Sequence, residues 1–236
     1  MGTTRAEYKG SILTFTDPDT KETSLPAAPV YFVEDFLGET FDTGKWATVE
    51  TNLNTAIGLM ADESNGVLSL IIDADNNAEE ATLYWGDQRP LNAGYNLNIE
   101  GRLRITTPGT ACAMVFGVAT DANGTPDSVA AHAWFRLQAS LALLAETDDA
   151  TTDDDDNDCG QTLVSGTWYV FRIDLSSLGD VGFYLDGVLL DPGTLSISAI
   201  SAGNSAMQPY LSLIKTSGTA TARVDVDYIR CWQERA

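Results

Sequence analysis

The densest chemistry in this chain is a run of carboxylates between residues 146 and 158. Eight of these 13 residues are acidic and none is basic. The acids are Glu146, Asp148, Asp149, Asp153, Asp154, Asp155, Asp156 and Asp158. Calcium prefers oxygen ligands, but a calcium loop also needs set spacing and a sharp glycine turn, which this run lacks. The run therefore predicts a solvated acidic loop, extended by self-repulsion. Weak calcium binding by Asp153, Asp154, Asp155 and Asp156 is the alternative, and no other cofactor is predicted.

The aromatic residues and the single histidine are the next candidates. His132 lies between two alanines and near Trp134, and the chain has no Gly-x-Ser-x-Gly nucleophile elbow. We therefore predict that His132 is a strand residue and not a catalytic base. Trp85 and Trp134 are candidates for stacking on sugar rings. The alternative is a core position, because tryptophans that alternate along apolar strands usually face a core.

Charge and cysteine content restrict the partners. The chain has 34 acidic and 13 basic residues and a net charge of −21 at pH 7. Such a surface repels phosphate backbones and anionic membranes, so we predict no nucleic-acid and no membrane partner. Cys112, Cys159 and Cys231 are odd in number and widely spaced, without a CxxC motif. They predict neither a zinc site nor a disulfide framework.

Strands separated by tight turns must position these residues. Residues 168–190 have the pattern of a strand, a short loop and a hairpin, and apolar residues alternate along residues 181–185. Asp186-Gly187 supplies the two positive-φ positions that a two-residue hairpin turn requires. Similar segments continue from residue 30 to residue 232 without a clear amphipathic helix. The pattern predicts an all-β sandwich or barrel.

Residues 1–30 differ from the predicted domain of residues 31–236. They hold turn and proline signals around one short β-like piece. That piece is Ile12, Leu13, Thr14 and Phe15. A lone strand cannot bury itself, so we predict an arm that adds a strand to the sheet edge of a partner. A partly ordered tail is the alternative.

Several motifs occur in a characteristic order from about residue 34 to residue 233. They are Glu34-Asp35-Phe36, Phe41-Asp42-Thr43-Gly44-Lys45-Trp46, residues 99–105, residues 114–117, residues 168–190 and residues 224–233. Together they resemble the concanavalin A-like lectin and glucanase jelly roll, in particular the laminarinase-like and LamG-like members found among phage virion and capsid decoration proteins. The resemblance implies a jelly-roll β-sandwich of two antiparallel sheets, here with an extended N-terminal arm.

The glucanases of this family carry their catalytic carboxylates on one strand as Glu-x-Asp-x-x-Glu, so that alternation points all three into the cleft. At the corresponding place this chain has residues 131–137, which contain no carboxylate. Glu146-Thr147-Asp148 begins the pattern, but Thr151 stands where the second Glu is required. The departure predicts that the protein is not an enzyme.

A jelly roll without that strand, with an acidic surface and an N-terminal arm, suggests a structural role. Our first hypothesis is a phage capsid decoration (cement) protein that docks through its arm on the major capsid protein or another virion protein. The expected location is the virion, assembled in the host cytoplasm, with a homotrimer as one arrangement. The alternative is a carbohydrate-binding, lectin-like module that recognises surface glycans, with a glycoside hydrolase or lyase as a further alternative.

Overall fold

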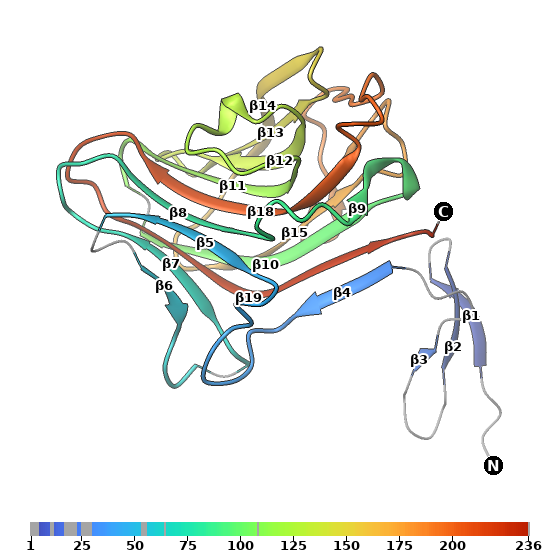
Figure 1. Cartoon of the computed structure of the whole chain (residues 1–236), viewed down its shortest axis with the longest axis horizontal. Helices are drawn as coiled ribbons and strands as arrows, with labels where there is room; N and C mark the ends of the chain where they lie inside the picture. The colour runs from blue at the N-terminus through green and yellow to red at the C-terminus, as the bar shows by residue number, and fades with distance from the viewer. Residues whose placement is uncertain are drawn as a thin grey trace.

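The computed structural model describes residues 30–52, 56–63, 65–107 and 109–235, and it gives strand backbone for residues 5–9, 12–16 and 23–24. Two antiparallel sheets pack face to face as a jelly-roll β-sandwich, which confirms the predicted fold (Figure 1). The first sheet has the order β17 (Val188–Leu189), β16 (Gly182–Leu185), β15 (Trp168–Asp174), β10 (Asn98–Thr107), β19 (Ala222–Gln233), β7 (Leu68–Ile72) and β6 (Ala56–Leu59), with β4 (Val30–Glu34) also paired to β19. The second has the order β14 (Asp153–Thr162), β13 (Ala142–Asp148), β12 (His132–Leu137), β11 (Cys112–Ala119), β18 (Ala206–Lys215), β8 (Glu79–Tyr84) and β5 (Ala47–Thr51), with β9 (Leu91–Asn92) on β18.

Two short 3₁₀ helices and a small N-terminal sheet complete the described elements. The helices are η1 (Ala93–Tyr95) and η2 (Pro126–Ser128), and the small sheet has β1 (Arg5–Lys9), β2 (Ile12–Thr16) and β3 (Thr23–Ser24). The predicted docking residues lie on β2, but their side chains are outside the described residues. They are Ile12, Leu13, Thr14 and Phe15. In the part of the chain that the structure describes, no helix is long and apolar enough to cross a membrane.

Turn residues set the strand connections as the sequence predicts. Asp186 and Gly187 have φ of 49° and 80°, and they connect β16 to β17. Asn65 and Gly66, with φ of 75° and 71°, precede β7 in the same way. A side chain at position 66 is also blocked, because its Cβ would lie 2.5 Å from the carbonyl oxygen of Phe36. Glycine is therefore required there on both counts.

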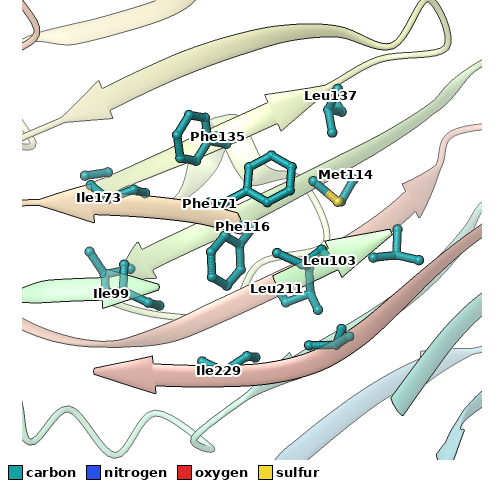
Figure 2. Close-up of a cluster of buried hydrophobic side chains, with 14 of the residues drawn as sticks. Ile99, Leu103, Met114, Phe116, Phe135, Leu137, Phe171, Ile173, Leu211 and Ile229 are labelled. Atoms are coloured by element: carbon teal, nitrogen blue, oxygen red, sulfur yellow. The ribbon is translucent and has the colours of Figure 1, made fainter. Parts of the chain in front are cut away.

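The main core lies between the two sheets. Figure 2 shows Phe116 and Phe135 of the second sheet gathered with Phe171 of the first. The ring of Phe171 lies 6.3 Å from that of Phe116 and 5.3 Å from that of Phe135, both edge-on. Ring contacts of this geometry add to the hydrophobic stabilisation from burial. They fix the inner face of β12, so the outer face of β12 carries the alternate residues.

A second, smaller cluster lies on the outer face of the second sheet. Trp134, Tyr210 and Val115 are fully buried there, outside the space between the two sheets. The segment between β11 and β12, residues 120–131, supplies the cover. Its Val129 belongs to the cluster, and the hydroxyl of Tyr210 donates a hydrogen bond of 3.1 Å to a carbonyl in this segment.

The acidic run is not the loop that its composition predicts. Residues 142–148 and 153–162 form the paired strands β13 and β14, joined at residues 149–152. Aspartate is a poor strand former, but strand preference depends strongly on neighbouring packing and pairing. Here β14 is an edge strand, and its acidic side chains remain largely in water. Charged side chains on an edge strand also discourage pairing with another molecule.

Candidate functional site

Three neighbouring strands, β12, β13 and β14, position the candidate site at one edge of the second sheet. The register places Trp134 opposite Glu146 and His132 opposite Asp148. Cross-strand partners share a face, so these side chains all belong to the outer face. A register shift then occurs between β13 and β14 around Glu146, where Asp156 has a φ of 53°. This bulge redirects the acidic strand toward Glu146.

Three carboxylates from three separate elements meet at this edge. Asp127 of η2, Glu146 of β13 and Asp155 of β14 each offer one oxygen, and these oxygens all lie within 4.8 Å of one another. Asp127 and Asp155 are exposed, whereas Glu146 is completely buried beneath them. We call these three residues the acidic cluster.

Arg136 supplies the positive charge of the cluster. Its Nη1 lies 2.5 Å from Asp127 Oδ1 and 3.2 Å from Glu146 Oε1. Trp134 Nε1 donates a hydrogen bond of 2.6 Å to Glu146 Oε2. Both oxygens of Glu146 are thus bound, so this residue orients Arg136 and Trp134 and does not face solvent.

Burial shifts the proton affinities in the cluster. It raises the pKa of Glu146 to about 7, against the opposing effects of the Trp134 hydrogen bond and of Arg136. Burial and the charge of the adjacent Asp153 raise the pKa of Asp155 to about 6. An exposed carboxyl that holds its proton near pH 6, beside one paired with an arginine, is an arrangement suited to acid–base chemistry.

A stack of rings borders the cluster. The ring of His132 lies 3.5 Å from that of Trp134 at an interplanar angle of 8°, and Tyr210 follows at 5.8 Å. Burial lowers the pKa of His132 to about 3, so the imidazole is neutral at pH 7. Gly117 lies in register between Trp134 and Tyr210, and its missing side chain leaves room for the stack. His132 is therefore a buried strand residue, as the sequence predicts.

The tryptophans predicted to bind sugar and the aspartates predicted to bind calcium differ in burial and in distance from the acidic cluster. Trp134 is fully buried, so neither face of its ring is available to a sugar, and its indole N–H donates a hydrogen bond to Glu146. Trp85 is half-buried against Phe32, at 4.8 Å between ring centroids. The predicted calcium ligands lie on β14, and Asp155 is the one among them that joins the cluster. The other three are Asp153, Asp154 and Asp156. Calcium binding by these residues stays a prediction. In the cluster, the guanidinium of Arg136 already provides a positive charge beside Asp127 and Glu146.

Sequence reasoning missed Asp127 and Arg136. Asp127 lies in a turn 19 residues before Glu146, and nothing local distinguishes it from other turn acids. Arg136 could have been suspected from the sequence, because it is a basic residue on a predicted strand shortly before the acidic run of residues 146–158, which contains no base. The contact between them depends on how the segment of residues 120–131 folds over the sheet.

Comparisons with known proteins support the fold. No protein-family model matches this chain, and no curated protein matches it. Among solved structures, the chain is similar to an endo-acting O-glycanase of human gut bacteria that initiates mucin breakdown, with a TM-score of 0.62 and 13% identity over 88% of this chain and 100% of that one. It is also similar to the laminarinase catalytic domain of Thermotoga petrophila, with a TM-score of 0.58 and 13% identity over 87% and 97%. The Bacillus licheniformis β-glucanase matches with a TM-score of 0.57 and 12% identity over 87% and 98%. The concanavalin A-like, laminarinase-like resemblance is thereby confirmed at the level of the fold.

These comparisons overturn two of our expectations. The hypothesis of a capsid decoration protein is contradicted, because the neighbours are mostly glucanases and carry no sign of a viral structural role. The prediction that the chain is not an enzyme is contradicted for the same reason. It relied on the missing carboxylates of β12, whereas the structure assembles carboxylates beside that strand from β13, β14 and η2.

Proposed function

We propose that the protein acts on carbohydrate, as a glycoside hydrolase that cleaves a polysaccharide at the acidic cluster. The observation that carries this proposal is the meeting of three carboxylates within 4.8 Å in different electrostatic surroundings. A retaining glycosidase requires two carboxyl groups about 5–5.5 Å apart, one that donates a proton and one that attacks. The similarity to glucanases and an O-glycanase supports polysaccharide as the substrate class.

The two exposed carboxyls have distinct roles in this mechanism. Asp155, with its raised pKa, gives its proton to the glycosidic oxygen as the bond to the anomeric carbon breaks. Asp127, paired with Arg136, attacks the anomeric carbon through a carboxylate oxygen and forms a glycosyl ester. A water molecule then hydrolyses the ester and returns its proton to Asp155. Glu146 acts beneath them as a positioning residue for Arg136.

Release of reducing ends tests the proposal. The substrates are mixed-linkage β-glucan, β-1,3-glucan and mucin glycopeptide, and the variants are Asp155→Asn and Asp127→Asn. We expect each variant to lower the rate by about 10²–10⁴-fold, the usual contribution of a positioned acid or base. Activity of the wild type should fall as the pH rises through about 6, when Asp155 loses its proton.

An exposed acid elsewhere provides the control. Glu39 lies outside the cluster, on the loop after β4, and Glu39→Gln should retain the wild-type rate. A wild type that releases no reducing ends from any of the three substrates contradicts the proposal. So does an Asp155→Asn, Asp127→Asn double variant with the wild-type rate.

A further inference from the structure

A row of side chains crosses the outer face of the first sheet, on the opposite side of the sandwich from the acidic cluster. The register aligns Tyr184 with Arg172, Arg172 with Glu100, Glu100 with Arg230, and Arg230 with Val33. The row thus spans β16, β15, β10, β19 and β4. At the usual strand spacing it is about 19 Å long, which suits an extended polymer better than a single small molecule.

Ion pairing and ring contacts hold the polar side chains of this row in place. Arg230 Nη2 lies 2.6 Å from Glu100 Oε1, which also accepts a hydrogen bond of 2.7 Å from the hydroxyl of Tyr228. The guanidinium of Arg172 lies over the ring of Tyr184, at 3.9 Å from its centroid. The polar groups are therefore held in fixed positions before any ligand arrives, which lowers the entropic cost of binding.

A second row runs beside the first and ends in aromatic rings. It aligns Asp174 with Asn98, Asn98 with Trp232, and Trp232 with Tyr31. Tyr31 is 55% exposed, and Arg230 lies 5.3 Å from the centroid of the half-buried Trp232. We call the two rows together the outer band.

A hollow of about 510 Å³ opens at the other end of the outer band. Tyr184 and Asp174 of the band line it, together with Asp180, Asp191 and Ser176. Its size lies within the usual range for ligand sites, which combine hydrophobic or aromatic surface with a few placed polar groups. The band therefore connects a polar hollow at Tyr184 with an exposed ring at Tyr31.

The charge balance identifies the kind of ligand. The two rows contain two arginines and two carboxylates, whereas the whole chain has a net charge of −21. A polyanion would meet repulsion from the remainder of the surface, and a polycation would find more negative charge elsewhere on the molecule. A neutral polymer fits the band best. Its apolar faces would pack on the aromatic rings, and its hydroxyl groups would hydrogen-bond to the carboxylate, amide and guanidinium groups.

We propose that the outer band binds a segment of a neutral polysaccharide, as a second site that holds the polymer without cleaving it. The choice of polysaccharide rests on the proposed function, but the binding does not require turnover. A polymer bound to one sheet remains close to the acidic cluster of the other, so the band raises the effective concentration of substrate.

Affinity electrophoresis in gels that contain mixed-linkage β-glucan or β-1,3-glucan tests this inference. We expect a Tyr184→Ala, Tyr31→Ala double variant to bind at least one of these glucans about tenfold more weakly than the wild type, since each ring contributes a modest contact energy. Leu37 is 68% exposed and lies outside the band, so Leu37→Ser is the control and should bind like the wild type. The single variant Tyr31→Ala shows whether weaker binding reflects misfolding, because removal of so exposed a ring leaves the core intact. We expect this variant to lose part of the glucan affinity that the double variant loses.

The outcomes separate this inference from the proposed hydrolase. If the wild type binds a glucan through the band but releases no reducing ends, the hydrolase proposal fails and the inference stands. If both tyrosine variants bind within twofold of the wild type, or if the wild type binds neither glucan, the inference is overturned whether or not hydrolysis is found.

Discussion

Lys215 offers the sharpest test of how the sandwich is stabilised. This lysine at the end of β18 is completely buried, with its Nζ 3.0 Å from Glu79 Oε1. The Nζ also donates to the carbonyl oxygens of Asp73, Asp75 and Ala220 at 2.7, 2.8 and 3.3 Å. One ammonium group therefore ties a loop and two strand ends together. A buried charge is tolerated only when paired and hydrogen-bonded in this way.

Lys215→Met removes the charge and keeps most of the side-chain volume. It leaves Glu79 as an unpaired buried carboxylate and removes a donor from three carbonyls. Removal of one partner from a buried ion pair costs about 3–5 kcal/mol. Because domains of this kind have a stability of about 5–15 kcal/mol, we expect a variant that still folds but with a free energy of unfolding lower by about 3–5 kcal/mol.

Urea unfolding at pH 7, followed by tryptophan fluorescence, measures this change. Addition of Glu79→Gln should recover about 1–2 kcal/mol, because the orphaned charge is then removed. Lys45→Met is the matched control, since Lys45 and Asp42 are about half exposed and 3.6 Å apart, and such a surface pair contributes about 0–1 kcal/mol. A loss below about 1 kcal/mol for Lys215→Met, or a double variant no more stable than the single one, would refute the reasoning.

Two further predictions concern the second sheet. The pKa of Glu146 is raised from 4.5 to about 7 by burial, so the folded state holds this proton more tightly and the contribution to stability is lost as the pH rises from about 4.5 to about 7. Glu146→Gln should remove up to about 3 kcal/mol of that pH dependence in urea unfolding, and an unchanged slope between pH 4.5 and 7 would count against the shift. Gly117→Ala should lower the free energy of unfolding by about 1–3 kcal/mol, because the new Cβ would overlap the carbonyl oxygen of Ala133 and would lie 2.6 Å from Trp134 Cα. Gly58→Ala, where the new Cβ would meet no atom within 4 Å beyond its own residue and its chain neighbours, is its control and should be within about 1 kcal/mol of the wild type.

The sequence predicts those features that depend on neighbouring residues. Asp186 and Gly187 form a positive-φ turn because their own conformational preferences require it, and the alternating apolar residues of β15 and β16 face the core because strand periodicity is local. The order of the motifs likewise identified the jelly roll. His132 is a strand residue for the same local reasons.

Prediction failed where long-range pairing determines the structure. The acidic residues of β14 have poor strand preference, but pairing with β13 makes them a strand. The absence of carboxylates from β12 predicts a non-enzymatic protein only if one strand must carry all of them. In the structure, Asp127, Glu146 and Asp155 come from three elements.

The sequence alone thus determined the strands, the main turns, the acidic surface and the jelly-roll architecture, since each follows from local pattern or composition. The tertiary structure decided which carboxylates meet, where Arg136 and Lys215 are paired, and which aromatic rings line the outer band. Those contacts depend on register between strands that are up to 203 residues apart in sequence, as in the pairing of Gln233 with Val30. A shift of one residue in register would move every side chain to the opposite face, and local preferences do not encode that choice.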